Sequence, residues 1–190
     1  MVLSKPDLVK YVESGALAFD PVLAVDAIEQ ASIDLRLGRQ FTTFKKDDNK
    51  YVASIQLSDR SLYDRADIWE TREEDFFVLR PGQFVLAQTL ERVKMPHDLV
   101  GFVEGRSSWA RAGVSIHLTA PKIDPGFNAQ ITLEMSNVGP KAVELRAGVD
   151  RPCQLILMQL STPLGEHEVY GTTADHIFQG QTSPVPVKRR

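Results

Sequence analysis

The residues from Gly105 to Asn137 gather more chemically reactive side chains than any other part of this sequence. Residues 105–111 read Gly-Arg-Ser-Ser-Trp-Ala-Arg and offer two guanidinium groups and two hydroxyls within one short loop or helical turn. Guanidinium groups, hydroxyls and free backbone N–H groups are the donors that hold phosphate oxygens. Asp124 follows in an Ile-Asp-Pro-Gly-Phe turn, and Glu134 lies in the strand-like run Ile-Thr-Leu-Glu-Met. Two carboxylates near a basic, hydroxyl-rich loop predict a nucleotide site with acid–base chemistry.

Several motifs, in family order, resemble the deoxycytidine triphosphate (dCTP) deaminase family within the trimeric deoxyuridine triphosphatase (dUTPase) superfamily. The strongest matches are Gly-Arg-Ser-Ser-x-Ala-Arg at 105–111, His-x-Thr-Ala at 117–120, Ile-Asp-Pro-Gly-Phe at 123–127 and Thr-Leu-Glu at 132–134. Weaker matches are Ala-Ser-Ile-Asp-Leu-Arg-Leu-Gly at 31–38 and Gln-Gly-Gln at 179–181. The resemblance implies hydrolytic deamination of dCTP to dUTP and ammonia. That step supplies dUTP or dUMP for thymidylate synthesis in pyrimidine deoxyribonucleotide metabolism.

The resemblance also implies roles for individual side chains. Glu134 would be the catalytic acid–base, because water must lose a proton before it can attack C4 of cytosine. Arg106 and Ser108 would contact the triphosphate, while Ser107 and Arg111 would also lie near the reacting water or the base. From the residues alone, two plainer interpretations stay open: a solvent-facing strand glutamate and a Ser-Ser helix cap.

The turn at 123–127 is expected to hold the sugar. In the superfamily, the aspartate at the position of Asp124 binds the 3′-hydroxyl and in the hydrolases also activates a water. Phe127 would stack on the deoxyribose, and His117 would hydrogen-bond in the site wall. A turn aspartate that bonds its own backbone is the alternative. The predicted catalytic residues are Glu134, Arg111 and Ser107, and the predicted substrate-binding residues are Arg106, Ser107, Ser108, Arg111, Asp124, Phe127, Thr132, Leu133, Glu134, Gln154, Tyr170 and Gln181.

Two departures from the family pattern keep other functions open. Where enzymes that only deaminate commonly carry His-Arg and dUMP-forming enzymes carry Gly plus an aromatic, this chain has Pro121-Lys122. The cation at 122 favours the first group. The family's phosphate-binding lysine falls on Ile177, with His176 beside it. The alternatives are therefore a bifunctional dCTP deaminase and dUTP diphosphatase that forms dUMP, a plain dUTPase, and a nucleotide sensor without enzymatic activity.

A zinc mechanism is excluded by the cysteine content. Zinc-dependent base deaminases hold the metal with His-x-Glu and Pro-Cys-x-x-Cys motifs. The chain has one cysteine, Cys153, followed by Gln-Leu-Ile, and its histidines lack partners at ligand spacing. We expect Cys153 to be a small buried hydrophobe and the protein to hold no metal of its own. Magnesium would bind through the substrate's triphosphate.

The composition predicts one ordinary globular domain over residues 1–190, with a mobile tail from about residue 181. Apolar residues make up 43% and charged residues 25%, and the formal net charge is −3. This charge argues against a general nucleic-acid binder. No apolar run is long enough to span a membrane and the start of the chain lacks a signal-peptide pattern, so we expect a cytoplasmic protein.

Hydrophobic patterning predicts an N-terminal helix and then a mostly β domain. Residues 4–14 are expected to be helical, with Ser4 and Asp7 forming a capping box and Gly15 ending the helix. Residues 31–37 predict a strand on which apolar residues alternate with Asp34 and Arg36. We expect these two charges to lie in a structural polar pair or an interface.

Short β-branched and aromatic runs separated by Pro and Gly predict the remaining strands. These strands are expected at 76–79, 84–90, 99–103, 131–135, 142–145 and 154–160. Residues 45–50 predict a solvated loop, and Trp69 is expected to anchor the charged segment 58–75. The expected fold is mainly β, a distorted jelly roll or β-barrel of the dUTPase-like type with an N-terminal helix and few short helices. The resemblance implies a homotrimer with its sites at subunit interfaces.

Overall fold

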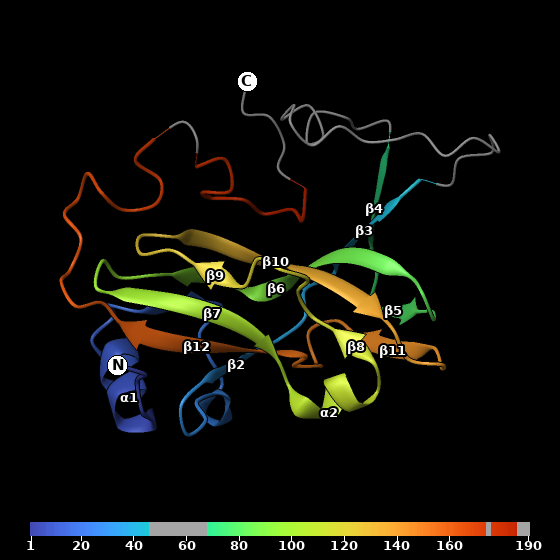
Figure 1. Cartoon of the computed structure of the whole chain (residues 1–190), viewed down its shortest axis with the longest axis horizontal. Coiled ribbons are helices and arrows are strands. Elements are labelled where there is room, and N and C mark those ends of the chain that lie inside the picture. The colour runs from blue at the N-terminus through green and yellow to red at the C-terminus, as the bar shows by residue number, and fades with distance from the viewer. Residues whose placement is uncertain (46–67, 174–175, 186–190) are drawn as a thin grey trace.

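The structure, a computed structural model, describes residues 1–45, 68–173 and 176–185. Within these residues, two short α-helices and a 3₁₀ turn accompany the strands (Figure 1). The elements are α1 (Lys5–Glu13), β1 (Ala18–Asp20), η1 (Val25–Ala27), β2 (Ile33–Leu35), β3 (Gln40–Phe44), β4 (Trp69–Glu73), β5 (Phe76–Leu79), β6 (Phe84–Lys94), β7 (Leu99–Gly105), α2 (Ser107–Arg111), β8 (Val114–Ser115), β9 (Lys122–Ile123), β10 (Asn128–Asn137), β11 (Val143–Arg146) and β12 (Cys153–Gln159).

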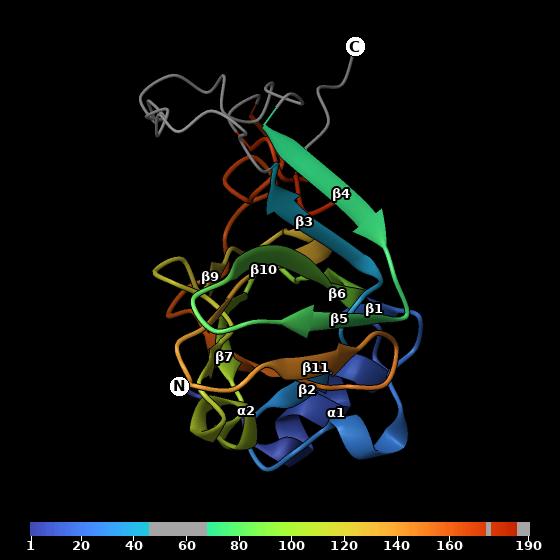
Figure 2. The ribbon, with the colours of Figure 1, turned by 90° about the vertical axis from the view of Figure 1, so that its right-hand side faces the viewer.

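The strands form two main sheets and a small ribbon. The larger sheet has the order β4-β3-β6-β10-β8, and β1 also pairs with β6. The second sheet has the order β2-β12-β7-β9, and β11 pairs with β5. Figures 1 and 2 show the β6–β10 pair lying over the β7–β12 pair, so that the two sheets face each other. This is the mainly β, layered architecture that the sequence predicts.

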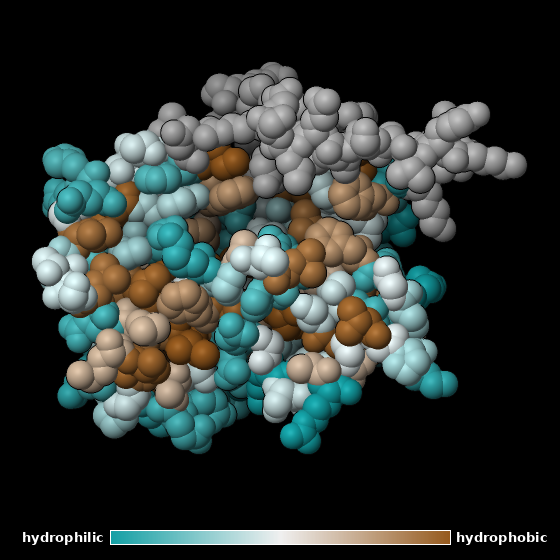
Figure 3. Space-filling view, viewed as in Figure 1, coloured by the Kyte–Doolittle hydropathy of each residue, from teal (hydrophilic) through white to brown (hydrophobic). Residues whose placement is uncertain are grey.

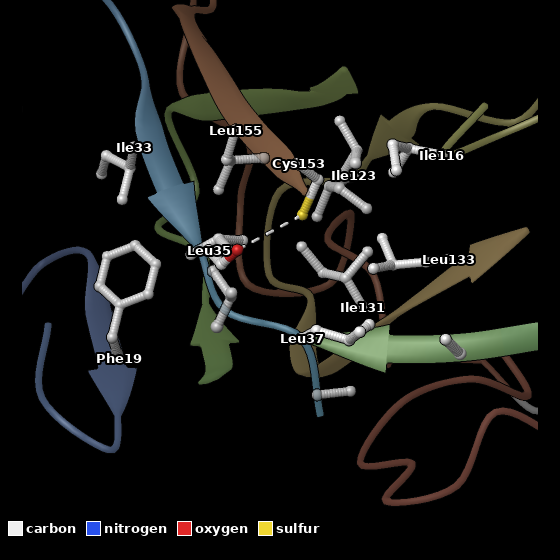
Figure 4. Packing of buried hydrophobic residues seen from close by; sticks show 14 of the residues in the cluster. Phe19, Ile33, Leu35, Leu37, Ile116, Ile123, Ile131, Leu133, Cys153 and Leu155 are labelled. Atoms are coloured by element: carbon white, nitrogen blue, oxygen red, sulfur yellow. Dashed lines mark hydrogen bonds between the residues drawn. The ribbon is translucent and has the colours of Figure 1, made fainter. Parts of the chain in front are cut away.

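Alternating side chains fill the space between the sheets. On β10, every second residue from Ala129 to Asn137 is buried, while the residues between them are partly exposed. Leu133 and Leu155 come from different sheets and are both fully buried (Figure 4). Cys153 lies in this core, where its thiol contacts the carbonyl oxygen of Leu35 and burial raises its pKa. The expectation that Cys153 is a small buried residue is therefore confirmed.

The N-terminal helix is confirmed, but its predicted capping box is wrong. Ser4 makes no side-chain bond to the helix backbone, because its hydroxyl donates instead to Asp7 Oδ2 at 2.7 Å. The helix ends as expected, since Gly15 adopts a φ of 73°, in the left-handed region that favours glycine. Leu8 is fully buried and anchors the helix on the core.

The predicted strand at 31–37 is present as the shorter β2. Its apolar residues Ile33, Leu35 and Leu37 are all fully buried, as expected. The charges between them are also largely withdrawn from solvent: Asp34 pairs with Arg106, and Arg36 pairs with Glu91 at 2.7 Å. The predicted structural polar pairs are thus observed.

All six strands predicted beyond residue 75 are present within a few residues of their expected bounds. The additional strands β1, β3, β4, β8 and β9 lack a clear alternating pattern and were not predicted. Trp69 stacks on Phe44 with ring centroids 4.2 Å apart, in keeping with an anchoring role. The rest of the predicted loop at 45–50 and the segment 58–67 lie outside the described residues. No helix in the described part of the chain is long and apolar enough to cross a membrane.

Candidate active site

The phosphate-binding loop predicted from the sequence is a tight connection between β7 and β8. Arg106 precedes α2, and its N–H donates to the carbonyl oxygen of Pro152 at 3.1 Å, which ties the loop to β12. Ser107, Ser108 and Arg111 are exposed on α2. No side chain caps this helix, so the interpretation of the serine pair as a cap is wrong. Among the described residues, no hydrogen bond or ion pair occupies these two hydroxyls or the Arg111 guanidinium, which leaves them available to a ligand.

Arg106 is more constrained than its neighbours. Its Nη1 lies 3.0 Å from Asp34 Oδ2 and 3.4 Å from the carbonyl oxygen of Arg151. The side chain is 38% exposed, so part of the guanidinium still faces solvent. Gln154 supports the same loop, because its Nε2 donates to the Gly105 carbonyl oxygen at 3.3 Å. The Gln154 Oε1 accepts a hydrogen bond from Ser32, so this predicted ligand contact is engaged in holding strands together.

Glu134 projects from the outer face of β10, on the side away from the core. The predicted alternation is confirmed: Thr132 and Glu134 share the partly exposed face, and Leu133 is fully buried. The Leu133 side chain therefore cannot reach a substrate, and only its backbone could take part in binding. Glu134 Oε2 accepts a hydrogen bond from the Leu118 N–H at 3.2 Å. This bond orients the carboxylate and leaves its other oxygen without a partner among the described residues.

Asp124 faces a lysine. Its Oδ1 lies 2.8 Å from Lys122 Nζ, and the Asp124 side chain is 36% exposed. Among the described residues, the Asp124 carboxylate accepts no hydrogen bond from its own turn, so the alternative of a turn-bonding aspartate is wrong. Gly126 adopts a φ of 81°, and a Cβ there would meet Val169 at 2.6 Å. The turn therefore requires glycine at 126.

The aromatic ring of Phe127 packs against the C-terminal segment. Phe127 is 7% exposed, and its ring centroid is 5.9 Å from that of Tyr170. The Tyr170 hydroxyl accepts a hydrogen bond from the Phe178 N–H at 3.2 Å, and burial raises the pKa of Tyr170. His176 stacks on Tyr170 at 4.4 Å, and its Nδ1 accepts a hydrogen bond from the Gly171 N–H. The chain thus brings Phe127 and Tyr170 together.

The beginning of the expected mobile tail lies along the outer face of β10. Gln181 Nε2 donates to the Gln130 carbonyl oxygen at 3.1 Å and to Thr132 Oγ1 at 2.9 Å. Gln88 is 4% exposed and donates to Gln130 Oε1 at 3.1 Å and to the Thr182 carbonyl oxygen at 3.4 Å. Residues 186–190 lie outside the described residues. Thr132 and Gln181, both predicted ligand contacts, are therefore direct neighbours.

Sequence reasoning did not single out Gln88 and Gln130, and it assigned Asp34 no link to the loop. Gln130 could have been predicted, because strand alternation places it on the same face as Thr132 and Glu134. Gln88 gave no such signal, since its strand places three consecutive buried residues at 87–89. His117 makes a hydrogen bond, as expected of it: its Nε2 lies 3.4 Å from Glu104 Oε2, and its Nδ1 is buried without a partner among the described residues.

Seven of the predicted site residues form two groups on one chain. Arg106, Ser107, Ser108 and Arg111 lie at α2, whereas Phe127, Tyr170 and Gln181 lie at the C-terminal segment. Figures 1 and 2 both place α2 on the opposite side of the sheets from this segment. No hydrogen bond or ion pair within the described residues joins the two groups. A single chain therefore presents the pieces of the predicted site on two separate surfaces.

Comparisons with known protein families and with individual proteins indicate the same family. The family described as dCTP deaminase-like matches residues 2–160. A protein of Methanosphaera stadtmanae named "dCTP deaminase, dUMP-forming" is 41% identical over 185 residues, which cover 96% of this chain and 91% of that protein. A Natronomonas pharaonis protein named "dCTP deaminase" is 40% identical over 185 residues, covering 97% and 92%.

A solved structure agrees with the fold. The crystal structure of the 2′-deoxycytidine 5′-triphosphate deaminase from Agrobacterium tumefaciens superposes with a TM-score of 0.64 at 21% sequence identity. The match covers 88% of this chain and 50% of that one, so this chain spans about half the length of the solved relative. The similarity confirms the predicted fold class.

Proposed function

Because the chain belongs to the dCTP deaminase-like family, we propose that it deaminates dCTP hydrolytically, with dUTP and ammonia as products. The observation that carries the proposal is the placement of Glu134. This carboxylate is held by one backbone N–H on a partly exposed strand face, in the motif that the family resemblance marks as catalytic. It combines a fixed orientation with one oxygen open to a water molecule.

The reaction requires one general acid–base, a group that accepts a proton and then donates it. Glu134 takes a proton from water as the water oxygen bonds to C4 of cytosine. The same carboxyl passes that proton to N3. It then moves the second proton of the added water from the C4 hydroxyl to the 4-amino group, which leaves as ammonia as the C4–N bond breaks and the C4 carbonyl forms. Ser107 and Arg111 lie near the reacting water or the base in this proposal. Water is the only co-reactant, so no electrons enter or leave the reaction.

The substrate's other parts have matching residues. We assign the triphosphate to Arg106, Ser108 and Arg111, since two cations and exposed hydroxyls suit phosphate oxygens. The sugar is assigned to Asp124 and Phe127. Tyr170, Thr132, Gln154 and Gln181 complete the predicted contacts.

The two separate groups of residues favour a homotrimer with its sites between subunits. In such an assembly, α2 of one copy would lie beside the C-terminal segment of another, which would complete the site. The apolar side chains that Figure 3 shows gathered over β7 and β12 supply a surface for association. The partly buried outward residues there are Val100, Phe102, Ile156 and Met158.

Magnesium is assigned to the substrate and not to the protein. In the described part of the chain, no group of three or more His, Cys, Asp or Glu side chains lies close enough to hold a metal ion. A magnesium ion carried by the triphosphate oxygens needs no such group. It would offset phosphate charge beside the basic loop.

A second candidate function is the dUMP-forming reaction, in which pyrophosphate is also released. The name of the Methanosphaera stadtmanae relative favours it. The ion pair between Lys122 and Asp124 favours dUTP as the final product, because a carboxylate oxygen that already contacts a lysine at 2.8 Å is less available to bind a second water.

Product analysis separates these functions. The full chain, at a confirmed oligomeric state, is incubated with magnesium and either dCTP or dUTP, and products are resolved by chromatography. Conversion of dCTP to dUTP with unchanged dUTP supports the main proposal. Pyrophosphate and dUMP from both substrates support the bifunctional enzyme. Pyrophosphate from dUTP alone identifies a plain dUTPase, and binding of both nucleotides without turnover identifies a nucleotide sensor.

A further inference from the structure

A buried carboxylate outside the predicted set of ligand contacts lies directly behind the phosphate-binding loop. Asp34 occupies the middle of β2, and its side chain is 3% exposed. Its Oδ2 lies 3.0 Å from Arg106 Nη1. Among the described residues, Arg106 forms the only ion pair with this carboxylate, while Arg151, Glu29 and Asp26 act on it from farther away. The two residues are 72 positions apart in sequence and meet because β2 and β7 both pair with β12.

A charged carboxylate at position 34 is not expected to stabilise the fold. Burial raises the pKa of Asp34, while the positive charge of Arg106 acts in the opposite direction. The free-energy cost of removing an ion from water often equals or exceeds the electrostatic stabilisation that it gains from its partner in a buried ion pair. An asparagine of the same shape would avoid that cost. A reason for the charge must therefore be sought in what it does to Arg106.

The contacts of Arg106 divide its guanidinium into a held end and an open edge. Nη1 faces Asp34 and the Arg151 carbonyl oxygen, and the backbone N–H is bonded to Pro152. Among the described residues, Nε and Nη2 make no hydrogen bond. A guanidinium is planar and rigid, so fixing one nitrogen fixes the direction of the others. The Nε–Nη2 edge can then bind two oxygens of one phosphate group.

We propose that Asp34 is a positioning residue, which holds the Arg106 guanidinium so that its Nε–Nη2 edge is presented to a substrate phosphate. The inference rests on the proposed function in one respect: it takes Arg106 as a phosphate contact. Asp34 itself touches no substrate. Its removal should weaken triphosphate binding while leaving the acid–base step at Glu134 intact.

Arg106→Ala alone is a poor test, because it leaves the buried Asp34 carboxylate without its partner and can destabilise the fold. Asp34→Asn keeps the shape of the side chain and removes the charge. The double variant Asp34→Asn/Arg106→Ala contains no stranded buried charge. Asp150→Asn is the matched control, since Asp150 is also a buried aspartate, 7% exposed, and its carboxylate pairs with Arg146.

The experiment is a double-mutant cycle on the full chain at a confirmed oligomeric state. Calorimetry measures binding of inorganic tripolyphosphate and of deoxycytidine, steady-state kinetics give kcat and KM for dCTP, and thermal unfolding reports stability. We expect Asp34→Asn to weaken tripolyphosphate binding by about 10-fold and to raise KM similarly, with kcat and deoxycytidine binding within about threefold. In the Asp34→Asn background, adding Arg106→Ala should weaken tripolyphosphate binding by less than about a further threefold. Asp150→Asn should bind tripolyphosphate as the unaltered protein does.

Each other outcome has a definite meaning. The inference is overturned if Asp34→Asn binds tripolyphosphate normally, if the Arg106 and Asp34 effects simply add, or if the unaltered protein does not bind tripolyphosphate. Equal losses for tripolyphosphate and deoxycytidine, or an equal loss in Asp150→Asn, would also overturn it, because they indicate general loosening. If no deamination occurs but the binding cycle behaves as expected, the proposed function fails and the role of Asp34 stands.

Discussion

Replacing Glu134 with glutamine removes a proton acceptor while preserving nearly all else about the side chain. The structure indicates that the fold will tolerate the change. Glu134 is only partly buried, and the bond that its Oε2 accepts from the Leu118 N–H can be accepted equally by the amide oxygen of glutamine. We expect the free energy of unfolding to change by no more than about 0.5 kcal/mol, as for other substitutions outside the core.

The effect on catalysis should be large. General acid–base catalysis contributes roughly 10²–10⁴-fold to a rate. At about 1.36 kcal/mol per factor of ten, this corresponds to about 2.7–5.4 kcal/mol of lost transition-state stabilisation. Because Glu134 acts on the reacting water, the loss should appear in both kcat and kcat/KM, while dCTP binding stays within a few-fold.

The assay follows dUTP and ammonia formation from dCTP at fixed times, on protein of confirmed oligomeric state. Glu144→Gln is the matched control, because Glu144 is an exposed glutamate on another strand, β11, and should keep full activity. If Glu134→Gln keeps more than about a tenth of the unaltered rate, Glu134 is not the general base and the mechanism is wrong.

Three further predictions follow from other contacts. Light scattering should give a mass of about three times the 21.2 kDa chain, and an active monomer would contradict a site built from two copies. Lys122→Ala should increase dUMP and pyrophosphate among the products, because it frees Asp124 to act as a base; unchanged products would show that the ion pair does not select the reaction. The Asp34 carboxyl has a pKa raised above its ordinary 3.8. The stability that it contributes is therefore present below that value and lost as pH rises through the folded-state pKa. Consequently, as pH rises above 3.8, the melting temperature of Asp34→Asn should increase relative to that of the unaltered protein, and a constant difference would argue against a raised pKa.

The parts of the fold that sequence could predict are those governed by local periodicity. On β10, alternation alone separates the buried Leu133 from the outward Thr132 and Glu134, because neighbouring side chains on a strand point to opposite faces. At Asp34 the alternation predicted only that the residue lies on the face opposite Ile33 and Leu35, in a polar pair or an interface. The pair is observed, but its partner, Arg106, could not be identified from any local pattern.

The candidate site shows the same division. Motif spacing predicted that the loop at 105–111 and the turn at 123–127 belong to the site, and each is built from consecutive residues. Sequence could not reveal that the two lie on separate surfaces of one chain, since this depends on how the sheets pack (Figure 2). Nor could it show that Gln181 reaches Thr132, because that contact joins residues 49 positions apart.

In both parts of the proposed site, one reactive side chain is held in place by a packed sheet. Glu134 lies on a strand whose opposite face forms the core, and its carboxylate is oriented by the hydrogen bond from the Leu118 N–H. Arg106 follows the end of β7, and a buried carboxylate on another strand of the same sheet fixes its direction. The two cases differ in consequence. Substitutions at Glu134 should change chemistry without changing stability, whereas substitutions at Arg106 should change both, because only Arg106 leaves a buried charge behind.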